Sequence, residues 1–388
     1  MHILIAPNAF KNSLDAASAA QAIYTGLSES RLDFTADVFP VADGGDGTGE
    51  LITAFSNGET ITCDTWDPLG RPIRSSHGLI YEGSVAVIEM AAASGLRLLN
   101  QNELDPLRAS SFGTGVLIRH ALDQKVKVIL LAMGGSATVD GGTGILTALG
   151  VRFLDAAGME LARSRLPGDL TELHSVDVSH VDTRIFLTRL VILCDVDSPL
   201  LGPGGAAKIF GPQKGANSGA VATLEKALAR FNDVTLQQTQ KNMAQMTYSG
   251  TAGGAAAGLA AFLNAGLVSG GSYFMDLTGF EAALGKADLV ITGEGKIDDQ
   301  TLMGKGAFQV ARKAKALNIP VIALAGSVPL VPNGTWAEYF DALIAIGNEP
   351  AGLNEALRDT AQNMIRVSQA IGELVQTGAR IGKVSLAK

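Results

Sequence analysis

Short apolar runs recur along the chain, at residues 3–6, 38–42, 85–88, 128–133, 190–194, 289–292, 320–325 and 342–346. They are rich in β-branched residues and do not alternate with polar ones, which predicts strands buried on both faces. Segments with apolar residues at helical spacing lie between them, at 13–27, 112–122, 219–231, 306–317 and 355–374. This alternation of strands and helices predicts an α/β fold with parallel sheets.

The length of 388 residues is enough for two or three domains. A turn-rich stretch at 66–73 and the segment 280–286 are the expected crossings between two domains. The first domain is then discontinuous, with residues 1–72 plus 285–388, and residues 73–284 are inserted into it.

Composition narrows the class of protein. Hydrophobic residues make up 47% of the chain and charged residues 18%, which favours a well-packed globular protein. The net charge of −8 argues against a nucleic-acid or acidic-membrane partner, although a small anionic substrate responds to local charge. Cys63 and Cys194 form no CxxC pair, which favours a reduced, cytoplasmic location. We expect neither a signal peptide nor a membrane span.

Most apolar runs end in small and acidic residues, and ligands of open α/β sheets bind beyond the carboxyl ends of the strands. The run at 128–133 leads into GGSATVDGG, residues 134–142. Its amides at Gly134 and Gly135 and its hydroxyls at Ser136 and Thr138 could cradle a phosphate, with Asp140 holding Mg²⁺ through water. The alternative is a tight strand–helix turn with Asp140 as a cap.

Carboxylates follow two further runs. VADGGDGT, residues 41–48, places Asp43 and Asp46 beside flexible backbone, which suits a hard cation or merely caps a helix starting near Thr48. CDVDSPL, residues 194–200, places Asp195 directly after a predicted strand, as a candidate general base or metal ligand.

Two lysines stand where an anion could bind. Lys11 follows the first strand in PNAFKNS, and Ser13 in the same segment resembles a helix N-cap. Lys214 lies in the Gly- and Pro-bounded GPQKGA loop, which either closes over a substrate or only connects two elements.

The densest cluster is DLVITGEGKIDDQTLMGK, residues 288–305. Acids and lysines that interleave after a buried strand are what a polyphosphate–Mg²⁺ complex requires. The segment contains Glu294, Lys296, Asp298, Asp299, Gln300, Thr301 and Lys305.

Other chemistries lack their sequence marks. No GxxxxGK(S/T), no GxGxxG after a strand, no GxSxG and no zinc-ligand spacing occurs. A site built of Gly, Ser, Thr, Asp, Glu and Lys suits positioning and charge neutralisation, which is what phosphoryl transfer demands.

The ordered segments APNAFKNSL, PVADGGDGT, GGSATVDGG, CDVDSPL, GPQKGA and DLVITGEGKIDDQTLMGK resemble the signature segments of bacterial type I glycerate kinases. The resemblance implies ATP- and Mg²⁺-dependent phosphorylation of D-glycerate, usually to 2-phosphoglycerate, in glycolate, glyoxylate or glucarate breakdown. It also implies two three-layer α/β domains: a Rossmann-like parallel-sheet domain and a second α/β domain inserted into it, with the active site in the cleft between them. The chain departs from the family pattern at Asn8, where an acid is more usual, and at Asp46, where Glu is frequent.

Roles follow as hypotheses. Catalytic roles are expected for Asp195, Lys11 and Lys305; substrate binding for Ser13, Asp43 and Lys214; phosphate or ATP binding for Gly134, Gly135, Ser136, Thr138, Asp140, Glu294 and Thr301; and metal binding for Asp43, Asp195 and Asp298. Three alternatives stay open: a kinase of another small hydroxy acid, a glycerate kinase that forms 3-phosphoglycerate, and a non-catalytic binding protein. The expected partner is the small-molecule substrate, and the sequence is compatible with a homo-oligomer.

Overall fold

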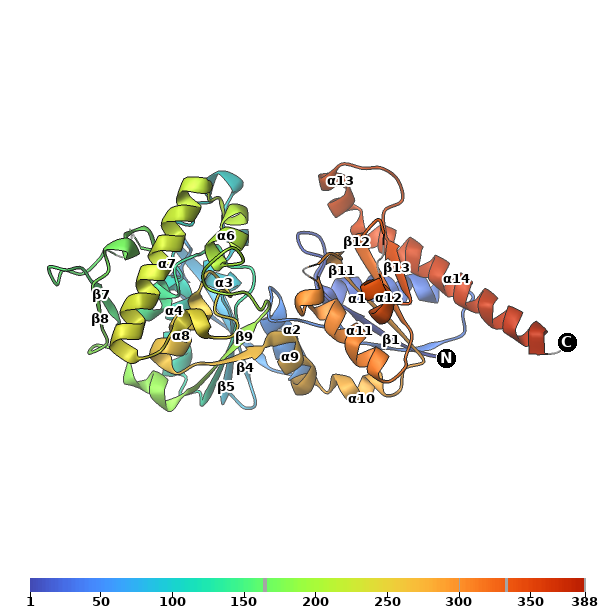
Figure 1. Ribbon diagram of the computed structural model, residues 1–388. Helices are drawn as coiled ribbons and strands as arrows, with labels where there is room; N and C mark the ends of the chain where they lie inside the picture. Colours follow the sequence, from blue (N-terminus) through green and yellow to red (C-terminus); the bar gives the residue numbers. More distant parts are fainter. Residues whose placement is uncertain (163–165, 300, 332–333, 387–388) are drawn as a thin grey trace. The chain divides into compact units, whose positions relative to one another are not determined.

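The computed structural model describes residues 1–162, 166–299, 301–331 and 334–386, so Gln300 of the predicted 288–305 cluster lies outside the described residues. The chain forms two compact units (Figure 1). Unit 1 comprises Met1–Asp43 and Phe274–Lys388, and unit 2 comprises Gly44–Tyr273. These boundaries differ from the predicted ones at 72 and 284.

The predicted crossing at 66–73 is wrong because this stretch is a hairpin turn inside unit 2. It joins β3 (Glu59–Trp66) to β4 (Pro72–Ile80), which pair antiparallel. The Asp67 carboxylate accepts the N–H groups of Leu69 and Arg71, which closes a tight turn. A side chain that binds its own backbone in this way satisfies the turn locally, so the stretch needs no domain boundary.

The second crossing lies earlier than predicted. Residues from Phe274 onward belong to unit 1. Phe280 begins α10 (Phe280–Leu284) and lies edge-on to Phe39 of the same unit, with ring centroids 5.3 Å apart. This aromatic contact buries Phe280 in unit 1, whereas the sequence placed the segment at a linker.

Unit 1 is built on a five-stranded parallel sheet with the order β13–β12–β11–β1–β2. In chain order this is 2-1-3-4-5, a doubly wound arrangement whose direction reverses between β1 and β11. The strands are β1 (His2–Pro7), β2 (Thr35–Val38), β11 (Leu289–Lys296), β12 (Val321–Ser327) and β13 (Ala342–Ala345). Ligands of such sheets bind at the reversal point, so the carboxyl ends of β1 and β11 are where a site is expected.

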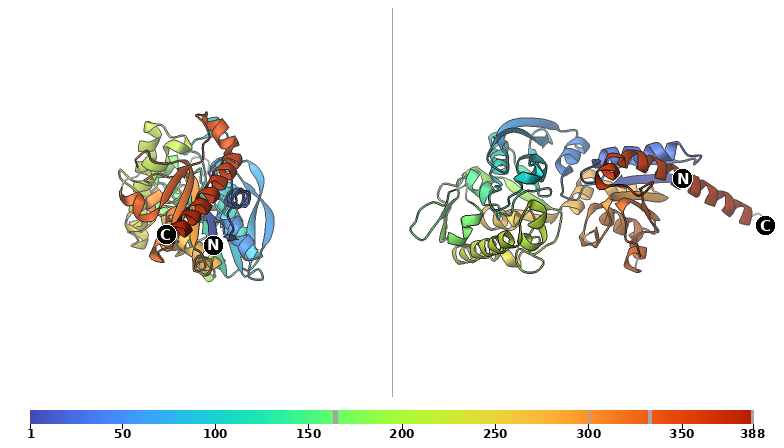
Figure 2. Two further views of the ribbon diagram at one scale, coloured as in Figure 1. Left: turned by 90° about the vertical axis from the view of Figure 1, so that its right-hand side faces the viewer. Right: turned by 90° about the horizontal axis from the view of Figure 1, so that it is seen from above.

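Helices cover both faces of this sheet (Figure 2). Alternate residues of β1 face opposite sides: Ile3 and Ile5 share a core cluster with α1 (Ala16–Ser28) and α14 (Thr360–Leu386), which Leu4 does not join. The two helices pack closely, since a Cβ atom on Gly26 would lie 2.2 Å from the Ile365 carbonyl oxygen. The other helices of unit 1, besides α10, are α11 (Gly306–Ala316), α12 (Gly334–Tyr339) and α13 (Leu353–Arg358), while α9 (Gly270–Thr278) spans the boundary between the units.

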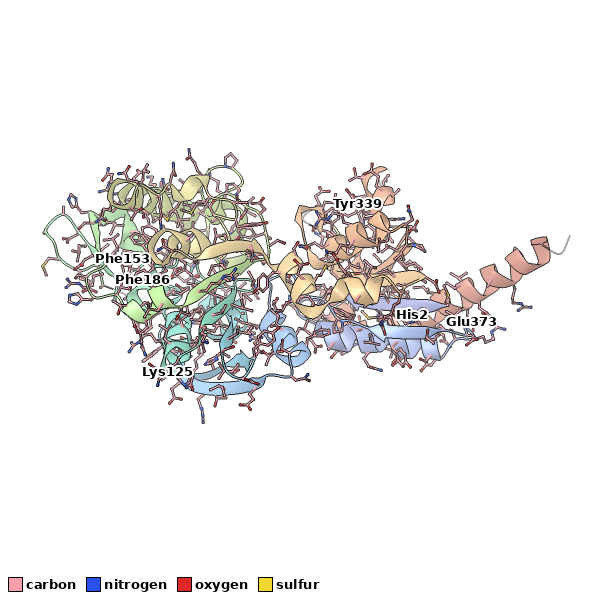
Figure 3. All side chains as sticks on the ribbon, turned by 90° about the horizontal axis from the view of Figure 1, so that it is seen from below. His2, Lys125, Phe153, Phe186, Tyr339 and Glu373 are labelled. Atoms are coloured by element: carbon pink, nitrogen blue, oxygen red, sulfur yellow. The ribbon has the colours of Figure 1, made fainter. Side chains whose placement is uncertain are left out.

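Two surface details complete unit 1. Glu373 of α14, labelled in Figure 3, forms an ion pair of 2.6 Å with Arg31, which follows α1. The helix predicted at 13–27 begins three residues later than expected, at Ala16, because Asp15, not Ser13, caps α1 by accepting the Ser18 N–H. Ser13 instead donates its hydroxyl to the Leu357 carbonyl oxygen at 2.6 Å.

The strand predicted at 38–42 is displaced, since β2 ends at Val38. Pro40 has no N–H to give to a ladder. The chain nevertheless stays beside β1, with the Phe39 N–H donating to Ile5 O and the Val41 N–H to Pro7 O. This extension delivers Asp43 to the carboxyl end of β1.

Unit 2 contains a six-stranded sheet with the order β10–β9–β6–β5–β4–β3. The strands β5 (Val85–Glu89), β6 (Val128–Ala132), β9 (Arg189–Cys194) and β10 (Gly266–Ser269) are parallel, while β3 and β4 add an antiparallel hairpin that the apolar runs did not predict. A separate pair joins β7 (Arg152–Leu154) and β8 (Ser175–Asp177). The helices of unit 2 are α2 (Thr48–Phe55), α3 (Ala91–Ser94), α4 (Phe112–Asp123), α5 (Thr143–Ala148), α6 (Ala206–Phe210), α7 (Ser218–Thr239) and α8 (Ala255–Leu263).

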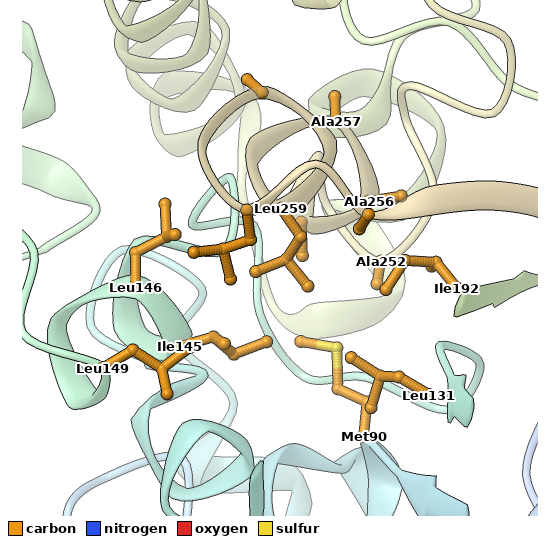
Figure 4. Packing of buried hydrophobic residues seen from close by; sticks show 14 of the residues in the cluster. Met90, Leu131, Ile145, Leu146, Leu149, Ile192, Ala252, Ala256, Ala257 and Leu259 are labelled. Atoms are coloured by element: carbon orange, nitrogen blue, oxygen red, sulfur yellow. The ribbon is translucent and has the colours of Figure 1, made fainter. Parts of the chain in front are cut away.

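The main core of unit 2 lies where α5 and α8 meet the sheet (Figure 4). Ile145 and Leu259 from these helices belong to the same buried cluster as Leu131 and Ile192 of the central strands. A Cβ atom on Gly258 would lie 2.0 Å from the Gly141 carbonyl oxygen, so α8 presses directly on residues 134–142. Core packing therefore holds this glycine-rich segment in place. Within the described part of the chain, no helix is both long enough and apolar enough to span a bilayer.

Candidate active site

We define the unit 2 cluster as the segment 134–142, the turn 44–47, Asp195 and Lys214. The segment 134–142 directly follows β6. Gly135 has a φ of 72°, a left-handed conformation that favours glycine. Ser136 and Thr138 are buried, and the Thr138 hydroxyl has no hydrogen-bond partner within the described part of the chain. A buried hydroxyl without a partner is rare in folded proteins and is available to a ligand.

Lys214 donates hydrogen bonds to this segment. Its side chain is only 3% exposed, and Nζ donates to Ser136 Oγ at 2.9 Å and to the Thr138 carbonyl oxygen at 2.7 Å. Burial lowers the pKa of Lys214 to about 8, while Asp195 and Asp140 act in the opposite direction. The sequence left open whether the GPQKGA loop reaches a substrate, and the structure brings its lysine to the predicted phosphate cradle.

The Asp140 carboxylate accepts four hydrogen bonds inside unit 2. The donors are the N–H groups of Ser111, Gly142 and Gly144 and the Ser111 hydroxyl. Three of these donors bind Oδ2 and one binds Oδ1, so both carboxylate oxygens are engaged inside the unit. The structure thus gives Asp140 the capping role weighed as the alternative, and any effect on a bound nucleotide would be exerted through the loop that it holds.

The turn 44–47, part of the VADGGDGT motif, contacts the segment 134–142. The Gly134 N–H donates to Gly44 O at 3.0 Å, and the Gly44 N–H donates to Thr48 Oγ1 at 3.1 Å. A Cβ atom on Gly134 would lie 2.3 Å from the Cα of Gly45. Two glycine-rich motifs far apart in sequence therefore touch through their backbones, which explains why neither carries a larger side chain there.

Asp195 follows β9 and reaches the same place. Its Oδ2 would be 2.9 Å from a Cβ atom on Gly134, and its charge acts on Lys214. The neighbouring Cys194 is buried, and burial raises the pKa of its thiol to about 12, which leaves it a poor nucleophile. The structure thus brings Asp195 together with Gly134, Ser136 and Lys214, which are all candidate site residues of the sequence analysis.

Sequence reasoning missed two residues beside this cluster. Glu89, the last residue of β5, is 7% exposed, and its Oε1 accepts the Gly49 N–H at 2.6 Å. Arg97 lies 3.0 Å from Asp46 and 4.0 Å from Glu89. Both residues lie in the segment that follows the apolar run 85–88, and an acid that directly ends a buried strand was the signal that could have found Glu89.

The unit 1 cluster, Asn8, Lys11, Asp43, Glu294, Asp298 and Lys305, gathers at the ends of β1 and β11. Asn8 Nδ2 donates to Asp43 Oδ2 at 2.8 Å, and the Gly306 N–H, at the start of α11, donates to the same oxygen at 3.3 Å. Asp43 is 8% exposed and Asn8 is equally buried. The amide at position 8 thus donates to a buried carboxylate, which the acid more usual in the resembled family could do only when protonated.

Glu294 is the most unusual carboxylate of the unit 1 cluster. It is 6% exposed, and its Oε1 has no hydrogen-bond partner among the described residues, while Oε2 lies 3.8 Å from Lys305 Nζ. Burial raises the pKa of Glu294 to about 7; Lys305, the Thr301 hydroxyl and Lys11 lower it, and Asp43 raises it further. A carboxylate repels phosphate, so Glu294 can act on a nucleotide only through a cation, a protonated carboxyl group or a hydroxyl.

The remaining residues of the 288–305 segment form a compact turn. Lys296 pairs with Asp298 at 3.0 Å, Lys305 lies 4.0 Å from Asp298, and the Thr301 hydroxyl accepts the Asp298 N–H at 3.1 Å. Thr301 is fully buried and therefore stabilises the turn. Ser13 donates its hydroxyl to the Leu357 carbonyl oxygen, and the structure describes no contact of Ser13 with the unit 1 cluster.

No group of three or more potential metal ligands among His, Cys, Asp and Glu occurs within the described residues. This does not conflict with a nucleotide-bound magnesium, because Mg²⁺ in phosphoryl transfer uses one or two carboxylates together with phosphate oxygens and water. The unpartnered oxygen of Glu294, close to the carboxylate of Asp43, fits a cation carried by phosphates.

Known proteins match the chain along nearly its whole length. The glycerate kinase family model matches residues 3–376. Glycerate kinase of Bacillus subtilis is 40% identical over 97% of this chain and 98% of its own length, and glycerate 2-kinase of Escherichia coli is 38% identical over 98% and 99%. The solved structure of a protein described as glycerate kinase 2 from Salmonella typhimurium LT2 superposes with a TM-score of 0.78 at 39% identity, covering 98% of this chain and 99% of that one. The chain is therefore a kinase that belongs to the glycerate kinase family.

Proposed function

We propose that this kinase transfers the γ-phosphoryl group of ATP to D-glycerate, with Mg²⁺, and forms 2-phosphoglycerate in organic acid catabolism. The observation that carries the proposal is the full-length match to glycerate kinases, which include a glycerate 2-kinase. The free thiols of Cys63 and Cys194 support a cytoplasmic setting.

In the unit 2 cluster, we assign phosphate binding to the segment 134–138. Its backbone amides and the Thr138 hydroxyl supply donors, and Lys214, which donates to Ser136 Oγ, adds a positive charge. Asp195 is the group assigned to orient the attacking hydroxyl and accept its proton, because it lies beside Gly134 in the same cluster.

In the unit 1 cluster, Lys11 and Lys305 supply positive charge next to two buried acids. We assign Lys11 or Lys214 to the glycerate carboxylate, and Lys305 to the charge that develops on the transferred phosphoryl group. Asp43 and Asp298 are the proposed magnesium ligands in this unit, with Asp195 the third candidate in unit 2. When bound, the cation would neutralise phosphate charge.

The proposal assigns both clusters to one reaction. The chain joins them directly, since Asp43 is part of the unit 1 cluster and the next residue, Gly44, is part of the unit 2 cluster. One peptide bond thus connects a candidate ligand of the cation to the turn that contacts the predicted phosphate cradle.

The test is to incubate the purified protein with ATP, Mg²⁺ and D-glycerate and to identify the product by phosphorus NMR. The proposal predicts 2-phosphoglycerate and an equal amount of ADP, with no product when EDTA removes the cation. A parallel panel of small hydroxy acids shows whether glycerate is preferred. Formation of 3-phosphoglycerate would contradict the product assignment, and ADP formation only with another hydroxy acid would contradict the substrate.

A further inference from the structure

Glu89 makes contacts that a simple surface acid would not. It ends β5 and is nearly fully buried, and its Oε1 accepts the Gly49 N–H at 2.6 Å and the Glu50 N–H at 3.4 Å. These are free amides of the first turn of α2, whose own N-cap residue, Gly47, has no side chain to satisfy them. A strand residue far away in the sequence therefore caps α2.

Arg97 links the same carboxylate to the turn that precedes α2. Its guanidinium lies 3.0 Å from Asp46 Oδ1 and 4.0 Å from Glu89 Oε2. The preceding residue, Leu96, donates its N–H to Gly135 O at 2.9 Å, and Gly95 pairs with Ser136. Arg97 is thus anchored to the 134–136 backbone at one end and to the turn 44–47 at the other.

The turn in question contacts the residues assigned to the reaction. Gly44 O accepts the Gly134 N–H, and a Cβ atom on Gly44 would lie 2.8 Å from the Leu193 carbonyl oxygen. A Cβ atom on Gly134 would meet both Gly45 and Asp195 Oδ2. With so little free space, displacement of the turn would be transmitted to Gly134 and Asp195.

We propose that Glu89 is a positioning residue for the phosphoryl transfer, acting through the α2 amides and through Arg97 to hold the turn 44–47 against Gly134 and Asp195. The inference rests on the proposed function, in which Asp195 and the 134–138 segment act on the substrates. The polar contacts that the structure describes for Glu89 are with Gly49, Glu50 and Arg97, so its effect on the reaction is indirect.

The competing interpretation is that Glu89 only stabilises α2. Glu89→Ala removes both the cap and the Arg97 contact, and Glu89→Gln keeps an oxygen for the Gly49 N–H while removing the charge. Asp182→Ala is the matched control. Asp182 also accepts a backbone N–H, that of Arg184, and pairs with the Arg184 guanidinium. It precedes the amino end of β9, whereas Asp195 follows the carboxyl end of that strand.

The first experiment measures kcat and KM of each variant well below its unfolding temperature. Positioning predicts that Glu89→Ala lowers kcat by about 10- to 100-fold. It predicts that Glu89→Gln recovers to within about threefold of the parent, because the cap is retained. Asp182→Ala should lower the Tm without changing kcat. Glu89→Ala with the parent kcat in its folded fraction would overturn the proposal.

A second variant protects the test if Glu89→Ala does not fold. Arg97→Met leaves the bond from Gly49 to Glu89 intact and removes the ion pairs of Arg97 with Asp46 and Glu89. Positioning predicts a kcat lowered by about three- to tenfold with a small change in Tm. An unchanged kcat would show that the link carries no positioning, and would overturn this part of the inference.

Amide hydrogen exchange makes the outcome independent of the substrate assignment. Positioning predicts that peptides covering 44–50 and 134–137 both exchange faster in Glu89→Ala, by about fivefold or more, and that neither changes in Asp182→Ala. If only 49–50 exchanges faster, Glu89 is a helix cap and no more. A parent enzyme that fails to phosphorylate glycerate would reject the proposed function, while the exchange result still decides the positioning.

Discussion

The two clusters differ in how far their polar groups are already satisfied. In unit 2, Asp140 accepts four hydrogen bonds within the unit, and Lys214 donates to two oxygens of the glycine-rich segment. In unit 1, one oxygen of Glu294 has no hydrogen-bond partner among the described residues, and Lys305 stands 3.8–4.0 Å from Glu294 and Asp298, beyond hydrogen-bond distance.

This difference suggests a division of labour. Saturated buried networks hold a backbone in one conformation, whereas an unpartnered buried group retains its capacity for a ligand. Changes in the unit 2 network should therefore affect stability and catalysis together, and changes in unit 1 should affect catalysis with little loss of stability. Four measurements test this contrast.

The largest expected effect is on unit 2. Asp140→Ala leaves buried donors of Ser111, Gly142 and Gly144 without a partner, which should lower the free energy of unfolding by about 3–5 kcal/mol. Urea unfolding measures this loss. Asp155→Ala is the control, because Asp155 accepts two N–H groups in an exposed turn and should cost about 1 kcal/mol or less. Equal losses would contradict the contrast.

The second prediction concerns pH. Burial raises the pKa of Glu89 to about 7, Asp46 and Glu50 raise it further, and the Gly49 N–H and Arg97 lower it. Folding therefore favours the protonated form, and its contribution to stability, at most about 3 kcal/mol, is complete below the unfolded pKa and is lost as the pH rises through 7. Urea unfolding from pH 4.5 to 8 should give a flatter profile for Glu89→Gln than for the parent. Parallel profiles would show that Glu89 has no raised pKa.

The third prediction tests the looser cluster. Lys305→Ala should lower kcat by about 10- to 100-fold, because it removes the charge next to Glu294, while the loss in free energy of unfolding should be smaller than that of Asp140→Ala. Lys296→Ala is matched to it, since Lys296 pairs with Asp298 but is 65% exposed, and its kcat should stay within about threefold of the parent. An unchanged rate for Lys305→Ala would make it a structural lysine only.

The smallest expected effect is at Asn8. Asn8→Asp replaces the donor to Asp43 by a second carboxylate 2.8 Å away, so one of the two must take up a proton. The free energy of unfolding at pH 8 should fall by about 1–2 kcal/mol, and most of the loss should disappear at pH 5. Urea unfolding at the two pH values checks this, and an equal loss at both would point to packing instead of charge.

Prediction from sequence was most reliable for the buried parallel strands. The runs at 85–88, 128–133, 190–194 and 289–292 all became strands, because an unbroken apolar run has few other ways to be buried. It was weakest for β3 and β4, whose exposed, alternating residues give little apolar signal. The domain boundaries were misplaced for the same reason, since pairing of β3 with β4 decides which unit contains the turn at 66–73.

The candidate residues were found because acids and lysines at strand ends are visible in the sequence, but their partners were not. Asp195 and Lys11 could be chosen by position alone. Glu89 and Arg97 could not, because their importance depends on contacts with α2 and Asp46 that only folding creates.

The alternating α/β plan, the strand-end location of the candidate chemistry and the family could all be recognised in the sequence alone, because apolar periodicity and local motifs are properties of neighbouring residues. The folded chain was needed to see that Asp140 accepts four internal hydrogen bonds, whereas Glu294 keeps an oxygen without a partner among the described residues. Hydrogen-bond satisfaction and desolvation depend on groups brought together from distant parts of the chain.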